Sequence, residues 1–108
     1  MPSKRLSLDE IQQQLQTLNH WHLDADQVSL HQEWQFDSFK TALQFLLKVG
    51  EMAERHDHHP EFLSRYTRLR IQLSTHDAGG LTQKDFALAW EIDQLLKNEF
   101  AHHLSTHR

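Results

Sequence analysis

Histidine is the residue type in this sequence best suited to chemistry near neutral pH. The chain contains ten histidines, and an imidazole gains or loses a proton at physiological pH, which makes it the usual general acid or base. Three of them, at positions 102, 103 and 107, lie in a polar segment where we expect them to be solvated. The informative ones are His56, His58, His59 and His76.

Carboxylates and a tyrosine accompany these histidines at defined spacings. The pattern reads Glu54-x3-His58-His59-Pro60-x5-Tyr66-x9-His76-x8-Asp85. The adjacent pair follows a predicted helix, and His76 follows a predicted strand. The three imidazoles can act on one substrate only if both loops lie at the same end of the fold, which the spacing alone does not establish.

A metal site is the strongest alternative use of these residues. Zinc binds His and Asp side chains, and four such residues are available here. However, adjacent histidines rarely converge on one ion without backbone strain, and Pro60 directly follows the i, i+3 pair His56 and His59. We therefore predict no metal. Scattered surface histidines without a role are the remaining alternative.

The elements that must position these residues are predicted from apolar periodicity and capping signals. Ser7 with Glu10, and Thr82 with Asp85, have the spacing of capping boxes, and Asp37 is the expected cap of the middle helix. We expect helices over 7–18, 37–56 and 82–100, and strands over 21–23, 28–36, 62–66 and 68–75. The order α-β-β-α-β-β-α predicts an α+β fold, a four-stranded antiparallel sheet with helices packed on one face.

For two helices the sequence predicts which sides are apolar, and for one loop it predicts the backbone conformation. The middle helix has one apolar stripe, formed by Phe39, Ala42, Leu43, Leu46, Val49 and Ala53. The last helix has a second apolar face, with Leu88, Ile92 and Leu95. That face favours a subunit interface or a wider core contact, and the pattern does not decide between them. Gly79 and Gly80 are expected to supply positive φ before the last helix.

Length and composition place limits on the remaining function classes. The 108 residues fit one domain spanning 1–108, with 1–5 and 102–108 expected to be mobile ends. The net charge of −4 gives no electrostatic reason to expect nucleic-acid binding. The absence of cysteine excludes disulfides and thiolate chemistry, and no apolar run approaches the ~20 residues of a membrane span. We expect a cytoplasmic protein.

The histidine pattern also carries a family resemblance. The segments 53–62 (AERHDHHPEF) and 74–82 (STHDAGGLT), with Lys84-Asp85, resemble pterin-4a-carbinolamine dehydratase. Trp21 and the segment 36–39 (FDSF) resemble it as well, so the similarity spans nearly the whole chain. Two positions depart from the family pattern. Lys84 stands where some members have arginine and so lacks the bidentate fork, and Phe62 stands where tryptophan is frequent.

The resemblance implies a lyase that dehydrates 4a-hydroxytetrahydropterin to quinonoid dihydropterin, recycling the cofactor of aromatic amino-acid hydroxylases. That elimination requires a general acid and a general base but no metal or redox cofactor. The positions matching His58, His59 and His76 are the essential ones in the family. The expected supporting and substrate-binding residues are Glu54, Asp57, Pro60, Phe62, Tyr66, Thr75, Lys84 and Asp85.

Within that reaction we expect His58 and His76 to transfer protons and His59 to hold the pterin. His58 follows a helix C-terminus, where the dipole favours imidazolium, so it is the better acid, and His76 the better base. Several supporting residues have simpler explanations. Asp85 has the spacing to complete a capping box, alone or in addition to a role in the site. The alternative for Tyr66 is a strand aromatic without a role, and the alternative for Glu54 and Asp57 is solvated charges.

The resemblance also implies partners. We expect a homo-oligomer, dimer or tetramer, with a small pterin substrate and neither nucleic acid nor membrane as a direct partner. Some family members also serve as dimerisation partners of a transcription factor. A second hypothesis is therefore a protein-binding module, similar to a transcription coactivator, that acts through its C-terminal helix.

Overall fold

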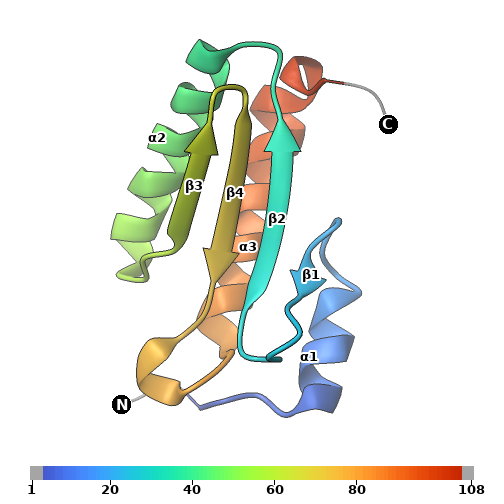
Figure 1. Cartoon of the computed structure of the whole chain (residues 1–108). Helices are drawn as coiled ribbons and strands as arrows, with labels where there is room; N and C mark the ends of the chain where they lie inside the picture. The colour runs from blue at the N-terminus through green and yellow to red at the C-terminus, as the bar shows by residue number, and fades with distance from the viewer. Residues whose placement is uncertain (1–3, 106–108) are drawn as a thin grey trace.

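Alternating apolar and polar residues form the strands. Helices with one apolar side pack against one face of these strands. The computed structural model describes residues 4–105 (Figure 1). Their elements are α1 (Leu8–Leu15), β1 (His22–Leu23), β2 (Leu30–Gln35), α2 (Phe39–His56), β3 (Glu61–Arg65), β4 (Arg68–Leu73) and α3 (Gln83–Leu95). Three short helical turns complete them, η1 (His76–Ala78), η2 (Leu96–Phe100) and η3 (Ala101–His103). The predicted element order is confirmed.

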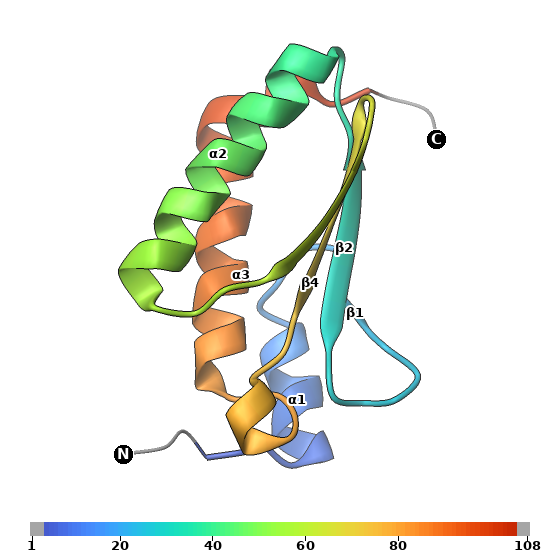
Figure 2. The same cartoon turned by 60° about the vertical axis from the view of Figure 1, so that its left-hand side comes forward.

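The strands form one antiparallel sheet in the order β1-β2-β4-β3. Along β4, Leu69 and Ile71 are fully buried and alternate with the more exposed Arg68 and Arg70, so the sheet has one apolar and one polar face. All three long helices cover the apolar face (Figure 2). The predicted α+β architecture is therefore confirmed, and the polar face of the sheet is open to solvent.

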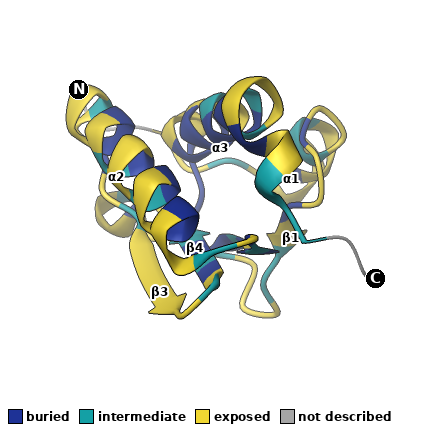
Figure 3. Cartoon of the chain, turned by 90° about the horizontal axis from the view of Figure 1, so that it is seen from above, coloured by how far each residue is buried: buried dark blue, intermediate teal, exposed yellow. Residues whose placement is uncertain are grey.

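The stripe by which α2 enters the core differs from the predicted one. Phe45 and Met52, which are not in the predicted stripe, are buried in the core. The buried apolar positions of α2 are Ala42, Phe45, Val49, Met52 and Ala53. Phe39 and Leu43, which we predicted to be buried, are 53% and 43% exposed. The two sets lie on adjacent sides of the helix. The sheet contacts the side that carries Phe45, and the outer side of α2 is exposed along its length (Figure 3).

The second apolar face of the last helix belongs to the core. Leu88, Ile92 and Leu95 are at most 6% exposed within this chain. The wider core contact is therefore the correct reading, and these side chains are not available to a partner. Trp90 is the large apolar residue of α3 that is exposed.

The cap of α2 differs from the predicted one, and the C-terminal segment contacts the residues before that helix. Both predicted capping boxes form, at Ser7 and Thr82, but α2 is capped by the side chain of Ser38 instead of Asp37. Asp37 instead lies 2.9 Å from His103, and Leu104 pairs with Phe36. Residues 103 and 104 therefore contact the segment before α2, and the expected mobility of this end stays a prediction. Residues 1–3 and 106–108 lie outside the described residues.

The loop before α3 depends on its two glycines in different ways. Gly79 has the expected positive φ, +73°, and ends the short turn η1. The φ of Gly80 is not positive. A Cβ atom there would come within 2.7 Å of Arg5 Nε, so this glycine allows a close approach of the N-terminal segment.

Candidate active site

Four elements begin or end at the same end of the sheet. The register pairs Glu61 at the start of β3 with Gln72 near the end of β4. The end of α2 is joined to β3 by residues 57–60, and η1 joins β4 to the start of α3 through a loop closed by the pair Thr75 and Gly80. Figure 1 shows these segments in its lower half, with η1 below the end of α2. The condition set by the sequence, that both histidine loops share one end of the fold, is met.

Asp57 turns the chain sharply at the end of α2. Its backbone is left-handed, with φ 50° and ψ 44°, a conformation that aspartate tolerates better than most residues. The amide N–H of His58 donates to the carbonyl of Ala53 at 3.0 Å and completes the helix end. As a result His58 is only 8% exposed.

The His58 imidazole is held by a buried carboxylate. His58 Nε2 lies 2.6 Å from Asp85 Oδ1. The other carboxylate oxygen accepts from the Thr75 hydroxyl at 2.8 Å and from the Thr82 amide at 2.9 Å, and the two threonine hydroxyls are 2.8 Å apart. Asp85 therefore completes the capping box of α3 and also contacts His58.

This contact assigns the two ring nitrogens of His58 to different tasks. Because Nε2 faces a carboxylate, we assign the proton of the neutral His58 ring to Nε2. Within residues 4–105, Nδ1 has no hydrogen-bond partner and is not fully buried. Nδ1 is therefore the nitrogen that can exchange a proton with another molecule.

His59 and Glu54 form a second, exposed pair. His59 Nε2 lies 2.5 Å from Glu54 Oε2, and the two side chains are 59% and 76% exposed. Solvent screens such a pair, so it contributes little to stability. It instead holds an imidazole at the surface beside the buried His58.

His76 is connected to this network through its neighbour in the chain. It is exposed and begins η1, directly after the buried Thr75. Two hydrogen bonds, His58 to Asp85 and Asp85 to Thr75, thus span from the loop after α2 to the residue before His76. This is how the fold brings His76 to the same end as the adjacent pair.

The remaining predicted site residues divide into two groups. Asp57, Pro60, Phe62 and Lys84 flank the network, at the end of α2, the start of β3 and the start of α3. Tyr66 does not: it lies in the β3–β4 turn with φ 56°, 83% exposed. The length of β3 separates it from the histidines by about 17 Å, at ~3.3 Å per residue. Within one protomer Tyr66 therefore lies apart from the histidines, and it is a turn residue and not the strand residue that we predicted.

Sequence reasoning missed two contacts. Thr82 was identified only as a cap, but its side chain also joins the buried network. His56 Nε2 lies 2.7 Å from Glu91, which ties α2 to α3 and gives this histidine a structural role. Among residues 4–105 no three His, Asp or Glu side chains are grouped so that they could hold a metal ion. In the same range no helix is long and apolar enough to cross a membrane.

Comparisons with known proteins show the family to which this chain belongs. A family model described as pterin 4 alpha carbinolamine dehydratase matches residues 4–95. A protein of Chloroflexus aurantiacus is 42% identical over 92 residues, 85% of this chain and 97% of that protein. A protein of Sinorhizobium fredii is 36% identical over 104 residues, 96% of this chain and 99% of that protein. Both carry the name pterin-4-alpha-carbinolamine dehydratase provisionally.

Two experimental structures are similar to this chain. A transcriptional coactivator/pterin dehydratase from Brucella melitensis has a TM-score of 0.82 at 29% identity, covering 85% of this chain and 98% of its own. A pterin dehydratase-like protein, described as a RuBisCO assembly factor in the alpha-carboxysome, has a TM-score of 0.61 at 21% identity, covering 73% and 92%. The second likeness shows a shared fold alone.

Proposed function

We propose that this chain, which belongs to the pterin 4 alpha carbinolamine dehydratase family, removes water from 4a-hydroxytetrahydropterin. The product is quinonoid dihydropterin, and the reaction serves to recycle the cofactor of aromatic amino-acid hydroxylases. The observation that carries the proposal is the buried His58–Asp85–Thr75 network, which joins the loops that bear the three histidines.

The chemistry of the step matches the groups at this site. The C4a–O bond of the adduct breaks, N5 loses its proton, and a C4a=N5 double bond forms as water leaves. No electrons are gained or lost, so the step needs one group that protonates the hydroxyl and one that takes the N5 proton. Positioned imidazoles supply both at neutral pH, and general acid–base catalysis of this kind contributes about 10²–10⁴-fold.

The geometry supports a specific division of roles. We assign His58 as the acid that protonates the 4a-hydroxyl, because Asp85 holds Nε2 and leaves Nδ1 to deliver the proton. We assign His76 as the base at N5. The exposed His59, steadied by Glu54, holds the pterin ring. Asp85 and Thr75 act as positioning residues and Thr82 caps α3, while Phe62 and Lys84 flank the substrate.

Two further parts of the proposal concern the state and location of the protein. We propose a homo-oligomer, and the exposed apolar side chains of Phe39, Leu43 and Leu47 on the outer side of α2 support it. This contact surface replaces the one predicted on the last helix. We also propose that the protein acts in the cytoplasm. Fractionation of cells that express a tagged chain would test that location.

The protein-binding hypothesis has weaker support. The name of the Brucella melitensis relative includes a coactivator. However, the apolar face of the C-terminal helix that suggested such a role is buried in this chain's own core. Dehydration is therefore the function that we favour.

A stopped-flow assay tests the proposal. Synthetic 4a-hydroxytetrahydropterin is mixed with the wild type, with His59→Ala, and with His103→Gln, a control at the opposite end of the fold. We expect the wild type and the control to accelerate dehydration equally and His59→Ala to do so less well. If the wild type matches the buffer rate, the proposed function is wrong.

A further inference from the structure

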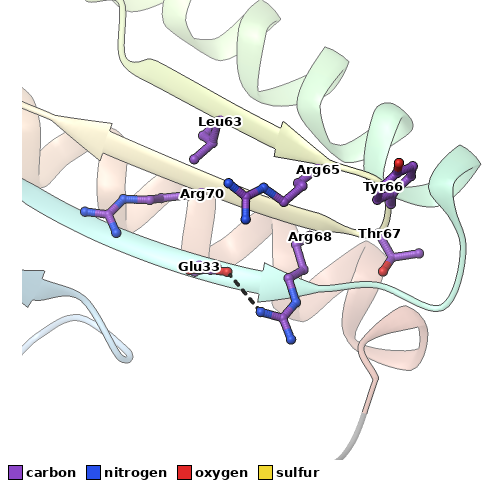
Figure 4. A pocket seen from close by; sticks show the side chains of 7 residues that line it. All are labelled: Glu33, Leu63, Arg65, Tyr66, Thr67, Arg68 and Arg70. Atoms are coloured by element: carbon purple, nitrogen blue, oxygen red, sulfur yellow. Dashed lines mark ion pairs between the residues drawn. The ribbon is translucent and has the colours of Figure 1, made fainter.

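The polar face of the sheet carries three arginines around one cavity. Arg65 stands at the end of β3, and Arg68 and Arg70 stand on β4. The register pairs Arg65 with Arg68 and Arg70 with Leu63, so all of these side chains point to the same, open face. The cavity that they line, together with Glu33 and Tyr66, has a volume of about 370 Å³ (Figure 4).

The positive charge of this cavity is poorly neutralised. Among the described residues, the ion pair formed by these arginines is Arg68 with Glu33, at a distance of 3.9 Å. Both side chains are about half exposed, so the contact is screened and weak. Three guanidinium groups and one carboxylate thus line this cavity, on a chain whose net charge is −4. Glu61 lies on the same face and lines an adjoining hollow with Arg70, so the excess of two positive charges belongs to the lining of the cavity itself.

The pairing of Arg65 with Arg68 has a structural cost. Like charges directly opposite each other on neighbouring strands destabilise a sheet. One charge on the edge strand β3 would suffice to discourage edge-to-edge association, and Arg68 and Arg70 lie on an inner strand. Protection of the edge therefore does not explain the cluster. A bound anion would offset the repulsion, because each guanidinium offers a planar pair of N–H donors to an oxyanion.

We propose that this cavity, here called the arginine site and lined by Arg65, Arg68 and Arg70, binds a small phosphate monoester. Its volume is at the low end of the range for small-ligand pockets. The exposed ring of Tyr66 and the exposed side chain of Leu63 supply an apolar wall for the organic part of the ligand. An extended polyanion fits less well, because the acidic chain as a whole repels it.

The arginine site is independent of the proposed dehydration. Tyr66 is separated from the histidines by the length of β3, and no residue of the proposed catalytic network lines the cavity. Loss of anion binding would therefore leave the dehydratase proposal untouched, and the reverse also holds.

NMR titration at constant ionic strength tests this inference. Phenyl phosphate and inorganic phosphate are added separately, against a sodium chloride background, while the arginine Nε–H and backbone amide signals are recorded. We expect saturable shifts centred on the three arginines and the β3–β4 turn. Tighter binding of phenyl phosphate would identify a monoester as the ligand. Equal binding of both would support the anion site but assign it to free phosphate.

Matched variants distinguish specific binding at the arginine site from non-specific attraction of anions to positive charge. Arg70→Gln is expected to weaken binding by about tenfold or more, the loss of one charge-assisted contact. Arg55→Gln removes the same charge from an exposed position on α2 and should leave binding unchanged. Arg65→Gln is the second site variant. Equal weakening by Arg55→Gln, shifts that do not saturate, or tighter binding of a DNA oligonucleotide than of phenyl phosphate would each overturn the proposal.

Discussion

Asp85 is the residue at which stability and the proposed chemistry are most closely joined. It is fully buried and accepts three hydrogen bonds, from His58, Thr75 and the Thr82 amide. An asparagine of the same shape keeps one oxygen acceptor but turns an NH2 group toward one of these donors. We therefore expect Asp85→Asn to lose at least one charge-assisted hydrogen bond, which costs about 1.5–3 kcal/mol of unfolding free energy.

The same loss is expected in the catalytic rate, because the contact orients His58. If the loss of this contact raises the activation free energy by the same 1.5–3 kcal/mol, the maximal dehydration rate falls about 10- to 150-fold. A positioning role also predicts a changed pH profile of kcat, since the proton on Nε2 is no longer fixed by a carboxylate. Stopped-flow dehydration at several pH values, together with urea unfolding, measures both effects.

Thr82→Ala is the matched control for this prediction. It removes the cap of α3, which typically costs about 1 kcal/mol, but leaves the contact between His58 and Asp85 intact. We expect its kcat to stay within about twofold of the wild type, well short of the tenfold that 1.4 kcal/mol would give. If Asp85→Asn retains the wild-type rate and pH profile while losing stability, Asp85 is only a cap and the positioning role is refuted.

Three other predictions follow from the same structure. His59→Ala should raise KM more than it lowers kcat in steady-state assays, because we assign the exposed His59 to holding the substrate; an effect on kcat alone would contradict that role. Burial raises the pKa of Asp93 above its ordinary 3.8, against the lowering effect of its hydrogen bonds from Asn19 and Trp21. The folded state therefore binds this proton more tightly, and the stability contributed by Asp93 is lost as pH rises from 3.8 through the folded value. Urea unfolding should show the wild type losing stability relative to Asp93→Asn over that range. A gain in relative stability would mean that the folded state lowers the pKa of Asp93, and would contradict this prediction. Leu47→Lys, at a 67% exposed position on α2, should lower the molar mass in light scattering without unfolding the chain, whereas an unchanged mass would place the subunit contact elsewhere.

The parts of the fold set by local sequence were predictable. Alternation in β4 and the spacing of Thr82 and Asp85 depend on residues close together in the chain, and both were recognised correctly. Predictions failed where two neighbouring residues, or two neighbouring sides of one helix, were equally suitable. Asp37 and Ser38 are both good caps, and only the position of the chain relative to the sheet selects Ser38. On α2 two apolar stripes are available, and contact with the sheet decides that Phe45 is inside and Phe39 outside.

The contacts that define the candidate site depend on long-range placement. His58 and Asp85 are 27 residues apart, so no local spacing reveals that they pair. From the sequence, Asp85 was expected to be a cap, alone or in addition to a role in the site. The structure shows the cap and a contact with His58. The site role of Tyr66 was expected from the family resemblance. The strand predicted to include Tyr66 ends one residue earlier, and Tyr66 and Thr67 form the two-residue turn at the far end of the sheet.

The most direct test of the account is a double-mutant cycle on the rate of dehydration. His58→Gln, His76→Gln and the double variant are compared with the wild type by stopped flow. If the two imidazoles act as one acid–base unit, each single change lowers kcat by about 10²–10⁴-fold, and the double variant is little slower than the worse single variant. Losses that multiply would show that the two histidines act independently and would contradict the central claim that the fold unites them in one site.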